Sequence, residues 1–432
     1  MIAGTVITLS WATARTLILP KHIQYDSLRA LYARPVAQWP KPEIDPNIQY
    51  QELAALPYDS SWLMIDKDAK VKLGQLLFFD PRLSASNQIS CSSCHDPEIG
   101  WGDARRVSLG NDHLEGSRNT MSLLNIGARR SFFWDGRSGS LADQVTSPLG
   151  AHHEMNMETP LLAKKIGKIE GYRPLFQKAY GNNKVTLEKI VEAIVTIESI
   201  IKSRQSRFDQ FVNGKYEALN DQEIKGLDLF RGKARCMNCH NGTFFTDEQF
   251  HNIGLSYYGR KYQDLGRYNI TKLAKDVGRF KTPSLRDVMK TGPWMHNGLF
   301  DNINGIINMY NSGMHQLDDK AKDKSDTLYP RTDVILRPLQ LTTEEKQALI
   351  SFLEAITATQ YKMRRPELPK DGLESLRNLH KKAGGEIAVI SQPIRATGKN
   401  TLNTLPDQIG TKQLEQVRSV PLPILSSGNP RR

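Results

Sequence analysis

All four cysteines of the 432-residue chain fall into two short motifs of the same form. Residues 91–95 read Cys-Ser-Ser-Cys-His, and residues 236–240 read Cys-Met-Asn-Cys-His. This is the attachment sequence of c-type haem, because two thiols one helical turn apart reach both vinyl groups and the next imidazole reaches the iron. We therefore expect two covalent haem c groups, held by Cys91, Cys94 and His95 and by Cys236, Cys239 and His240.

Other uses of paired cysteines fit the sequence less well. A structural zinc site usually separates its two pairs by about 15 to 20 residues, whereas Cys94 and Cys236 lie far beyond that spacing. A thioredoxin-like dithiol needs a βαβ context, which neither pair has. Disulfides are an alternative in an oxidising compartment, but they would not require a histidine after each second cysteine.

The composition is that of a folded protein that is large enough for two or three globular units. Hydrophobic residues make up 39% of the chain and charged residues 24%, and the net charge is +12. Such a charge fits a nucleic acid, an anionic lipid or an acidic protein as partner. Because Lys and Arg are scattered along the chain and not gathered on one helix face, we do not expect a nucleic acid partner.

Three segments carry both the start signal and the apolar spacing of an amphipathic helix. Thr186 precedes one of them, Asn220 with Glu223 opens the second, and Thr342 with Glu345 opens the third. A side-chain oxygen at these positions satisfies a free N–H of the first helical turn. Another helix is predicted to end near residue 80, just before the first motif. Each cysteine pair thus lies between an entry helix and a closing helix, which indicates a weak internal duplication.

The predicted fold class is mainly α, with two cytochrome c-like haem domains packed around a shared interface and with long loops. Residues 84–157 show no long helical period and are rich in Gly, Ser and Asn, so we expect ordered loops around a ligand there. The predicted division is a leader and N-terminal arm (1–70), a first haem domain (71–205), a second haem domain (206–365) and a polar, disordered tail (366–432).

Further motifs follow in a fixed order between about Leu76 and Ala358. Residues 79–84 read Phe-Asp-Pro-Arg-Leu-Ser, 133–137 read Phe-Trp-Asp-Gly-Arg, and 295–298 read Met-His-Asn-Gly. Arg-Asn-Thr at 118–120, Glu-Met at 154–155 and Thr-Pro-Ser-Leu-Arg at 282–286 complete the set. With the two haem motifs, the chain resembles the bacterial di-haem cytochrome c peroxidase family, which includes MauG.

The resemblance implies roles for three residues around the haems. Hydrogen peroxide would bind the N-terminal haem, where Glu154 would act as acid and base and Gln144 would hydrogen-bond the ligand. Trp134 would lie between the haems and carry electrons. By the residues alone, Glu154 reads as a surface carboxylate beside two histidines, and Trp134 reads as a core aromatic.

The resemblance also implies a calcium ion between the haems. Its ligands would be the side chain of Asn119 and the backbone carbonyls of Thr291 and Pro293. Hard oxygen donors suit this ion. Taken alone, Asn119 reads as a turn residue.

Two positions depart from the plain peroxidase pattern. Where many family members place a distal histidine that blocks the N-terminal haem, this chain has Asn111, with His113 two residues later. At the second haem the usual methionine ligand is replaced by Tyr310, with Met309 and Met314 as rival ligands. A tyrosine ligand is the MauG pattern, and an anionic oxygen favours the more oxidised states of iron.

The expected function is a di-haem peroxidase that reduces hydrogen peroxide at the N-terminal haem with electrons passed through the C-terminal haem. One alternative is MauG-like oxidation of a partner protein's side chain, with oxidising equivalents stored on both haems. Another is an electron-transfer cytochrome without catalysis. The partner would be a small electron-donor protein or a protein substrate, and the chain would be a monomer or a homodimer.

A periplasmic location follows from the haem motifs, because covalent haem in bacteria is attached outside the cytoplasm. Residues 2–14 form a short apolar run that ends in small residues and resembles a truncated signal sequence.

Overall fold

The computed structural model describes residues 21–316, 326–359 and 363–371. The apolar run at 2–14 and residues 372–432 of the predicted tail lie outside these ranges. The described part is mainly helical, as expected, with one short antiparallel strand pair, β1 (Phe250–His251) with β2 (Phe280–Lys281). Its α-helices are α1 (Lys21–Tyr32), α2 (Ala69–Phe79), α3 (Cys91–Cys94), α4 (Leu141–Gly150), α5 (Thr159–Gly167), α6 (Arg173–Tyr180), α7 (Leu187–Ser199), α8 (Arg207–Val212), α9 (Asp221–Arg231), α10 (Tyr268–Thr271), α11 (Ile303–Asn311) and α12 (Thr343–Ala355).

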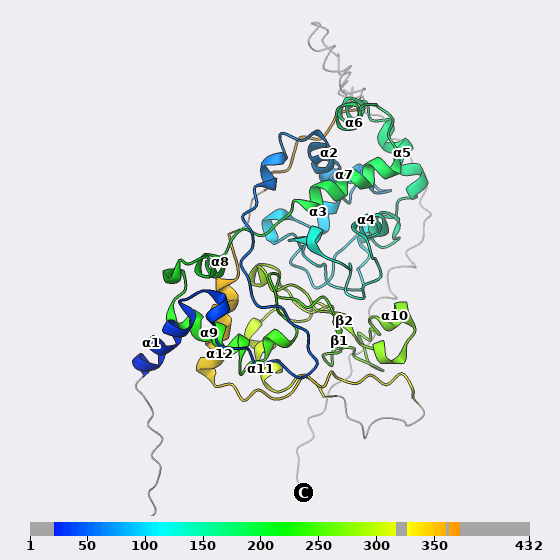
Figure 1. Cartoon of the computed structure of the whole chain (residues 1–432). Helices are drawn as coiled ribbons and strands as arrows, with labels where there is room; N and C mark the ends of the chain where they lie inside the picture. Colours follow the sequence, from blue (N-terminus) through cyan, green and yellow to red (C-terminus); the bar gives the residue numbers. More distant parts are fainter. Residues whose placement is uncertain (1–20, 317–325, 360–362, 372–432) are drawn as a thin grey trace, which may run out of the picture. The chain divides into compact units, whose positions relative to one another are not determined.

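Two helix pairs form the centres of two hydrophobic cores. Helix α2 packs along α7, and α9 packs along α12 (Figure 1). Helices α4, α5 and α6 add to the α2–α7 pair, which we call the first lobe. Helices α1 and α11 pack beside α9 and α12, which we call the second lobe.

The two lobes repeat one helix crossing. A Cβ atom at Gly74 of α2 would lie 2.0 Å from the carbonyl oxygen of Ala193 in α7. At Gly226 of α9 it would lie 2.0 Å from the carbonyl oxygen of Ala348 in α12. Each entry helix therefore needs a glycine where its backbone touches the closing helix. This shared contact supports the internal duplication that the sequence indicates.

The N-terminal segment belongs to the core of the second lobe. Tyr32, Trp39 and Leu53 are buried among the side chains of α9 and α12. The hydroxyl of Tyr32 donates to Asp228 at 2.8 Å, and buried Arg231 pairs with Glu52 at 2.5 Å. The predicted arm thus supplies apolar side chains to a core that is mostly built from residues after 206.

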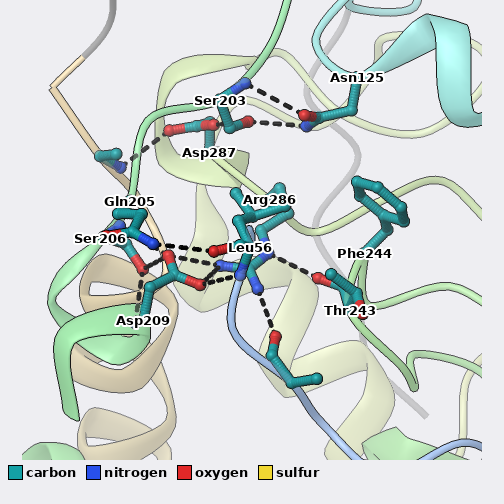
Figure 2. Close-up of polar contacts among 12 residues, drawn as sticks. Leu56, Asn125, Ser203, Gln205, Ser206, Asp209, Thr243, Phe244, Arg286 and Asp287 are labelled. Carbon is teal, nitrogen blue, oxygen red and sulfur yellow. Dashed lines mark hydrogen bonds and ion pairs between the residues drawn. The ribbon is translucent and has the colours of Figure 1, made fainter. Parts of the chain in front are cut away.

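A buried polar network holds the chain segment between α7 and α8 (Figure 2). Arg286 and Asp209 form an ion pair at 2.8 Å, and both side chains are almost fully buried. Asp209 also accepts from the backbone N–H of Leu56 at 2.7 Å. Arg286 donates to the carbonyl oxygens of Ala54 and Thr243, both at 2.8 Å. One ion pair therefore joins the arm, the connecting segment and the loops of the second lobe.

The predicted helix starts at Thr186, Asn220 and Thr342 are confirmed. Thr186 accepts from Lys189 N at 3.3 Å, and the other two form reciprocal capping boxes with Glu223 and Glu345. The expectation of loops alone across residues 84–157 was wrong, because α4 lies inside this segment. Only Val145 and Leu149 of α4 are buried, and Pro148 interrupts its pattern, so the sequence signal is weak. No helix among the described residues is long and apolar enough to span a membrane.

Candidate functional site

The first cysteine motif forms one turn of helix at the edge of the first lobe. Helix α3 contains both thiols, and Ser90 and Ser93 cap its start reciprocally. His95 follows immediately, and its Nδ1 lies 3.1 Å from the carbonyl oxygen of Trp101. A hydrogen bond from Nδ1–H to this carbonyl fixes the imidazole plane and leaves Nε2 free as a ligand atom.

The second motif repeats this arrangement in the second lobe. Cys236 begins a short 3₁₀ helix, and the Nδ1 of His240 lies 3.0 Å from the carbonyl oxygen of Phe245. Burial lowers the pKa of both His95 and His240, so each imidazole is neutral near pH 7. Neutral imidazole is the form that binds a metal.

The geometry around the cysteines gives no support to two of the alternative readings. None of the four forms a disulfide. Burial raises the pKa of Cys94 to about 11 and that of Cys236 to about 12. A reactive redox dithiol has a lowered pKa instead. These thiols therefore lack the character of a thioredoxin-like pair.

A cavity of about 280 Å³ opens beside the second motif. Cys236, Cys239 and His240 line one side, and the rest of the lining is mainly apolar. Two arginines line its wall, and each has one buried N–H group without a hydrogen-bond partner: Nη2 of Arg129 and Nε of Arg235. Two thiols, a neutral imidazole, apolar walls and unpaired cationic donors together fit a haem with its two propionates.

Tyr310 lies on the wall of this cavity. It is the second-last residue of α11, and Ile303, Ile306 and Ile307 of the same helix also line the cavity. Neither Met309 nor Met314 is among the lining residues. Burial raises the pKa of Tyr310, so its phenol stays protonated unless a cation lies against it. Of these three candidate ligands, Tyr310 is thus the one that lines the cavity containing His240.

Trp134 lies on the same cavity wall and joins it to the first lobe. Its indole N–H donates to the carbonyl oxygen of Asn119 at 2.9 Å. Its ring meets the imidazole of His296 edge to face, with centroids 6.4 Å apart, and His296 stacks on Phe280 at 3.5 Å. An aromatic group therefore extends from Trp134 into the second lobe.

The three predicted calcium ligands all line this cavity. Asn119 donates its side-chain N–H to the carbonyl oxygen of Arg105 at 3.0 Å, and its backbone N–H donates to His296 O at 2.8 Å. These bonds direct the Asn119 amide oxygen away from Arg105. Thr291 and Pro293 follow a segment that packs tightly, since a Cβ at Gly100 would lie 2.5 Å from the carbonyl oxygen of Lys290.

Glu154 lies near the first motif, on a loop that contacts the helix containing Gln144. Glu154 is near enough to Cys94 for its charge to raise the pKa of that thiol, after the larger effect of burial. Its loop folds back on α4, where Met155 N donates to Pro148 O at 3.2 Å. Gln144 in α4 has a buried side-chain oxygen without a hydrogen-bond partner. Such an unsatisfied group is typical of a ligand site.

Asn111 occupies the position where many family members have a distal histidine, and its loop packs on the backbone of Glu154. Asn111 N donates to Glu154 O at 2.8 Å, and the Asn111 side chain is buried and donates to Asp112 at 3.0 Å. His113, two residues later, is exposed.

The structure also reveals polar pairs that the sequence did not predict. Arg118 and Asp135 belong to two of the sequence motifs, and Arg118 pairs with Asp135 at 2.5 Å and with Asp264 at 2.6 Å, which joins the two lobes. His251 lies between Asp247 and Asp333, at 2.9 and 2.7 Å; burial lowers its pKa, but these two carboxylates and Cys239 raise it to about 12. Asp264 and Asp333 lie far from their partners in the chain, so no local motif indicates these pairs.

Comparison with known proteins shows the family of the chain. Residues 68–217 match the family model for di-haem cytochrome c peroxidase. Over 303 residues the chain is 34% identical to the methylamine utilization protein MauG of Methylorubrum extorquens, covering 69% of this chain and 81% of that protein. Over 308 residues it is 30% identical to cytochrome c551 peroxidase of Nitrosomonas europaea, covering 71% and 85%.

Solved structures show the same likeness. A MauG-like protein associated with microbial copper homeostasis superposes with a TM-score of 0.60 at 27% identity, covering 73% of this chain and 93% of that one. A variant of the dihaem peroxidase BthA of Burkholderia thailandensis gives a TM-score of 0.56 at 25% identity, covering 70% and 89%.

The chain belongs to the di-haem cytochrome c peroxidase family. Membership makes it an oxidoreductase of the peroxide-using type rather than a cytochrome without catalysis. It also shows that the cofactors are two covalently bound haem c groups, as the two motifs predict.

Proposed function

We propose that the protein reduces hydrogen peroxide at the haem of His95, with electrons supplied through the haem of His240. The observation that carries this proposal is the position of Glu154, whose carboxylate lies near Cys94 of the first motif and on a loop folded against α4. Residues 71–205 would then form the peroxidatic domain and 206–365 the electron-transfer domain, with the haems facing a shared interface.

Glu154 and Gln144 would handle the proton and the position of the peroxide. When bound, the haem supplies the iron at which the two electrons are delivered. Glu154 takes a proton from the near oxygen of peroxide and returns it to the far oxygen, which leaves as water. The unpartnered side-chain oxygen of Gln144 accepts a hydrogen bond from the peroxide O–H and orients it. Two electrons and two protons convert each peroxide into two waters.

Trp134 would connect the two lobes for electron transfer. It lines the cavity of the second motif, and its indole N–H is fixed on Asn119 of the first lobe. An indole held in one orientation changes its surroundings little on electron transfer, so its reorganisation energy is small. Calcium, held by Asn119, Thr291 and Pro293, would fix the relative positions of the loops that surround Trp134.

Steady-state peroxide consumption with a reduced small cytochrome c tests this function. We expect two molecules of donor to be oxidised per peroxide. A holoprotein with both haems that oxidises no donor and consumes no peroxide would contradict the proposal.

Tyr310 favours a second candidate, the oxidation of a partner protein's side chain as in MauG. It lines the cavity while both methionines lie outside it, and Asn111 replaces a distal histidine with His113 exposed. A phenolate ligand favours oxidised iron, and a first site without a histidine ligand needs no reductive activation. In this case peroxide alone would produce an oxidised form that persists until the partner protein is added, whereas a scavenging peroxidase would require the reduced donor.

The proposed location is the periplasm, where haem c is attached in bacteria. The small electron donor or the protein substrate would meet the protein there.

A further inference from the structure

A group of tyrosines lies on the second lobe, outside the residues assigned to catalysis. The rings of Tyr257 and Tyr262 meet edge to face with centroids 6.2 Å apart, and those of Tyr258 and Tyr329 meet at 5.9 Å. Tyr262 is 44% exposed, and its backbone φ of 72° is rare for a residue with a side chain. Tyr268 completes the group, because its phenol acts electrostatically on Tyr258.

Tyr258 differs from the others in its hydrogen bond. Its hydroxyl donates to both carboxylate oxygens of Asp326, at 2.8 and 3.0 Å. Partial burial and this carboxylate raise the pKa of the phenol, so Tyr258 keeps its proton near pH 7. A phenol that loses an electron becomes a strong acid. Asp326 is therefore a base in hydrogen-bond contact, ready to accept the proton when Tyr258 is oxidised.

A tightly packed route connects this group with Trp134. The residue after Trp134 is Asp135, whose backbone carbonyl accepts from Arg267 at 3.1 Å, and Arg267 is bonded in sequence to Tyr268. Packing around this contact is close, since a Cβ at Gly136 would lie 2.3 Å from the ring of Phe250. The route from the indole of Trp134 to Tyr268 thus crosses the backbone of Asp135, one hydrogen bond, the Arg267 side chain and the peptide bond to Tyr268, the residue whose phenol acts on Tyr258.

We propose that Tyr258 is a redox-active residue through which oxidising equivalents reach the protein surface. This inference rests on the proposed function, which supplies peroxide as the oxidant. Tyr258 gives one electron towards Trp134, its O–H bond breaks, and the proton passes to Asp326, which leaves a neutral tyrosyl radical. An external one-electron donor then returns the electron, and the proton moves back from Asp326. Two such oxidations supply the two electrons that one peroxide consumes.

The surface around the tyrosines indicates the class of donor. Exposed Arg260 lies over the ring of Tyr257 at 5.4 Å, and exposed Lys261 lies over Tyr262 at 5.0 Å. Cations beside the exit would attract an anionic reductant and increase its rate of encounter. The inferred donor is therefore a small anionic reductant such as an enediolate or a phenolate.

The experiment is EPR of the oxidised holoprotein, frozen shortly after peroxide is added, on protein labelled with ring-deuterated tyrosine. We expect an organic radical signal that narrows with the label in the wild type and in the control Tyr50→Phe, which alters a tyrosine that is 43% exposed in the arm. In Tyr258→Phe the tyrosyl signal should fall about tenfold, and Asp326→Asn should reduce it by a similar factor because the base is lost.

Peroxide loss is measured in the same samples to separate the two proposals. Peroxide consumption with an unchanged tyrosyl signal in Tyr258→Phe would overturn the role of Tyr258 and leave the proposed function intact. If the wild type consumes no peroxide, the proposed function fails and this inference fails with it.

Discussion

The imidazoles of His95 and His240 are held by the same kind of hydrogen bond, although the residues that accept it differ. Each imidazole has Nδ1 within 3.1 Å of a backbone carbonyl, from Trp101 in one lobe and Phe245 in the other. A backbone carbonyl tolerates any side chain at its own residue, so the contact fixes the ring without requiring a motif. The attachment motifs could be predicted from the sequence, but these carbonyl partners could not, because no residue type marks them.

Replacement of Glu154 by Gln tests the proton-transfer role at the residue scale. Glutamine keeps the size of the side chain but cannot exchange a proton, so peroxide consumption should fall by about 10²- to 10⁴-fold. Haem content, measured from the absorption spectrum, should not change. The matched control is Glu158→Gln, an exposed carboxylate four residues later. Equal activity in both variants would remove Glu154 from the mechanism.

Glu198 gives a pH-dependent prediction. This residue of α7 is buried with one carboxyl oxygen unpartnered, and burial raises its pKa from 4.5 to about 8. Between these values the native protein keeps a proton that the unfolded chain has lost. Stability is therefore greatest below the unfolded pKa and falls as pH rises towards 8.

The substitution Glu198→Gln should remove the fall in stability between pH 5 and pH 8, because glutamine does not titrate. We expect the difference in Tm between pH 5 and pH 8 to be smaller than in the wild type, as measured by thermal unfolding of the holoprotein. Glu192→Gln, at an exposed position of the same helix, should retain the wild-type difference. An unchanged pH dependence in Glu198→Gln would show that Glu198 is ionised in the native state.

At the scale of elements, local signals explain which helices the sequence predicts. Asn220 and Thr342 each act within three residues of their partners, so their capping boxes are visible in the sequence. Helix α4 has only two buried residues and Pro148 near its end, and its position depends on contacts with the rest of the lobe. Gln144 could therefore be identified only by resemblance, and its helical setting was missed.

Long-range pairs account for the rest of the site that the sequence does not reveal. Arg118 and Asp264 are 146 residues apart, and Tyr258 and Asp326 are 68 apart. An isolated arginine or aspartate reads as a surface charge, because most such residues are exposed. Only the folded chain shows that these groups form buried or partly buried pairs.

The Arg286–Asp209 pair at the connecting segment should be essential to stability (Figure 2). Asp209→Asn leaves the buried guanidinium without its counter-charge, which costs about 3 to 5 kcal/mol in comparable buried pairs. We expect a lower midpoint in denaturant unfolding of the holoprotein. The control, Glu192→Gln, breaks the exposed pair with Lys70 and should cost at most about 1 kcal/mol. A loss no greater than that of the control would contradict the role of the network.

For the whole molecule, the same helix crossing occurs twice, at Gly74 and Ala193 in the first lobe and at Gly226 and Ala348 in the second. The two lobes are therefore built around the same helix pair. The lobes then diverge in what surrounds the crossing. The arm with Tyr32 and Trp39 completes the core of the second lobe, whereas α4, α5 and α6 complete that of the first. The sequence indicated the duplication, but the arm's place in the second core depends on tertiary packing alone.

Removal of calcium tests communication between the lobes. The proposed ligands lie on loops of both lobes, so a chelator should loosen the contacts of Trp134 while both haems stay covalently attached. We expect peroxide turnover to fall and to recover when Ca²⁺ is added, but not when the same concentration of Mg²⁺ is added, since Mg²⁺ demands a smaller octahedral site. Full activity after chelation, with no calcium detected by elemental analysis, would contradict the assignment.

The most direct test of the central claim is an optical and EPR spectrum of the fully oxidised holoprotein before and after one equivalent of hydrogen peroxide. The claim is that the haem of His95 is open and that the haem of His240 is closed by Tyr310. It predicts one high-spin and one low-spin ferric haem at rest, which peroxide converts to a persistent oxidised form. Two low-spin haems that ignore peroxide until partly reduced would contradict it, because a distal ligand such as His113 would then close the first site.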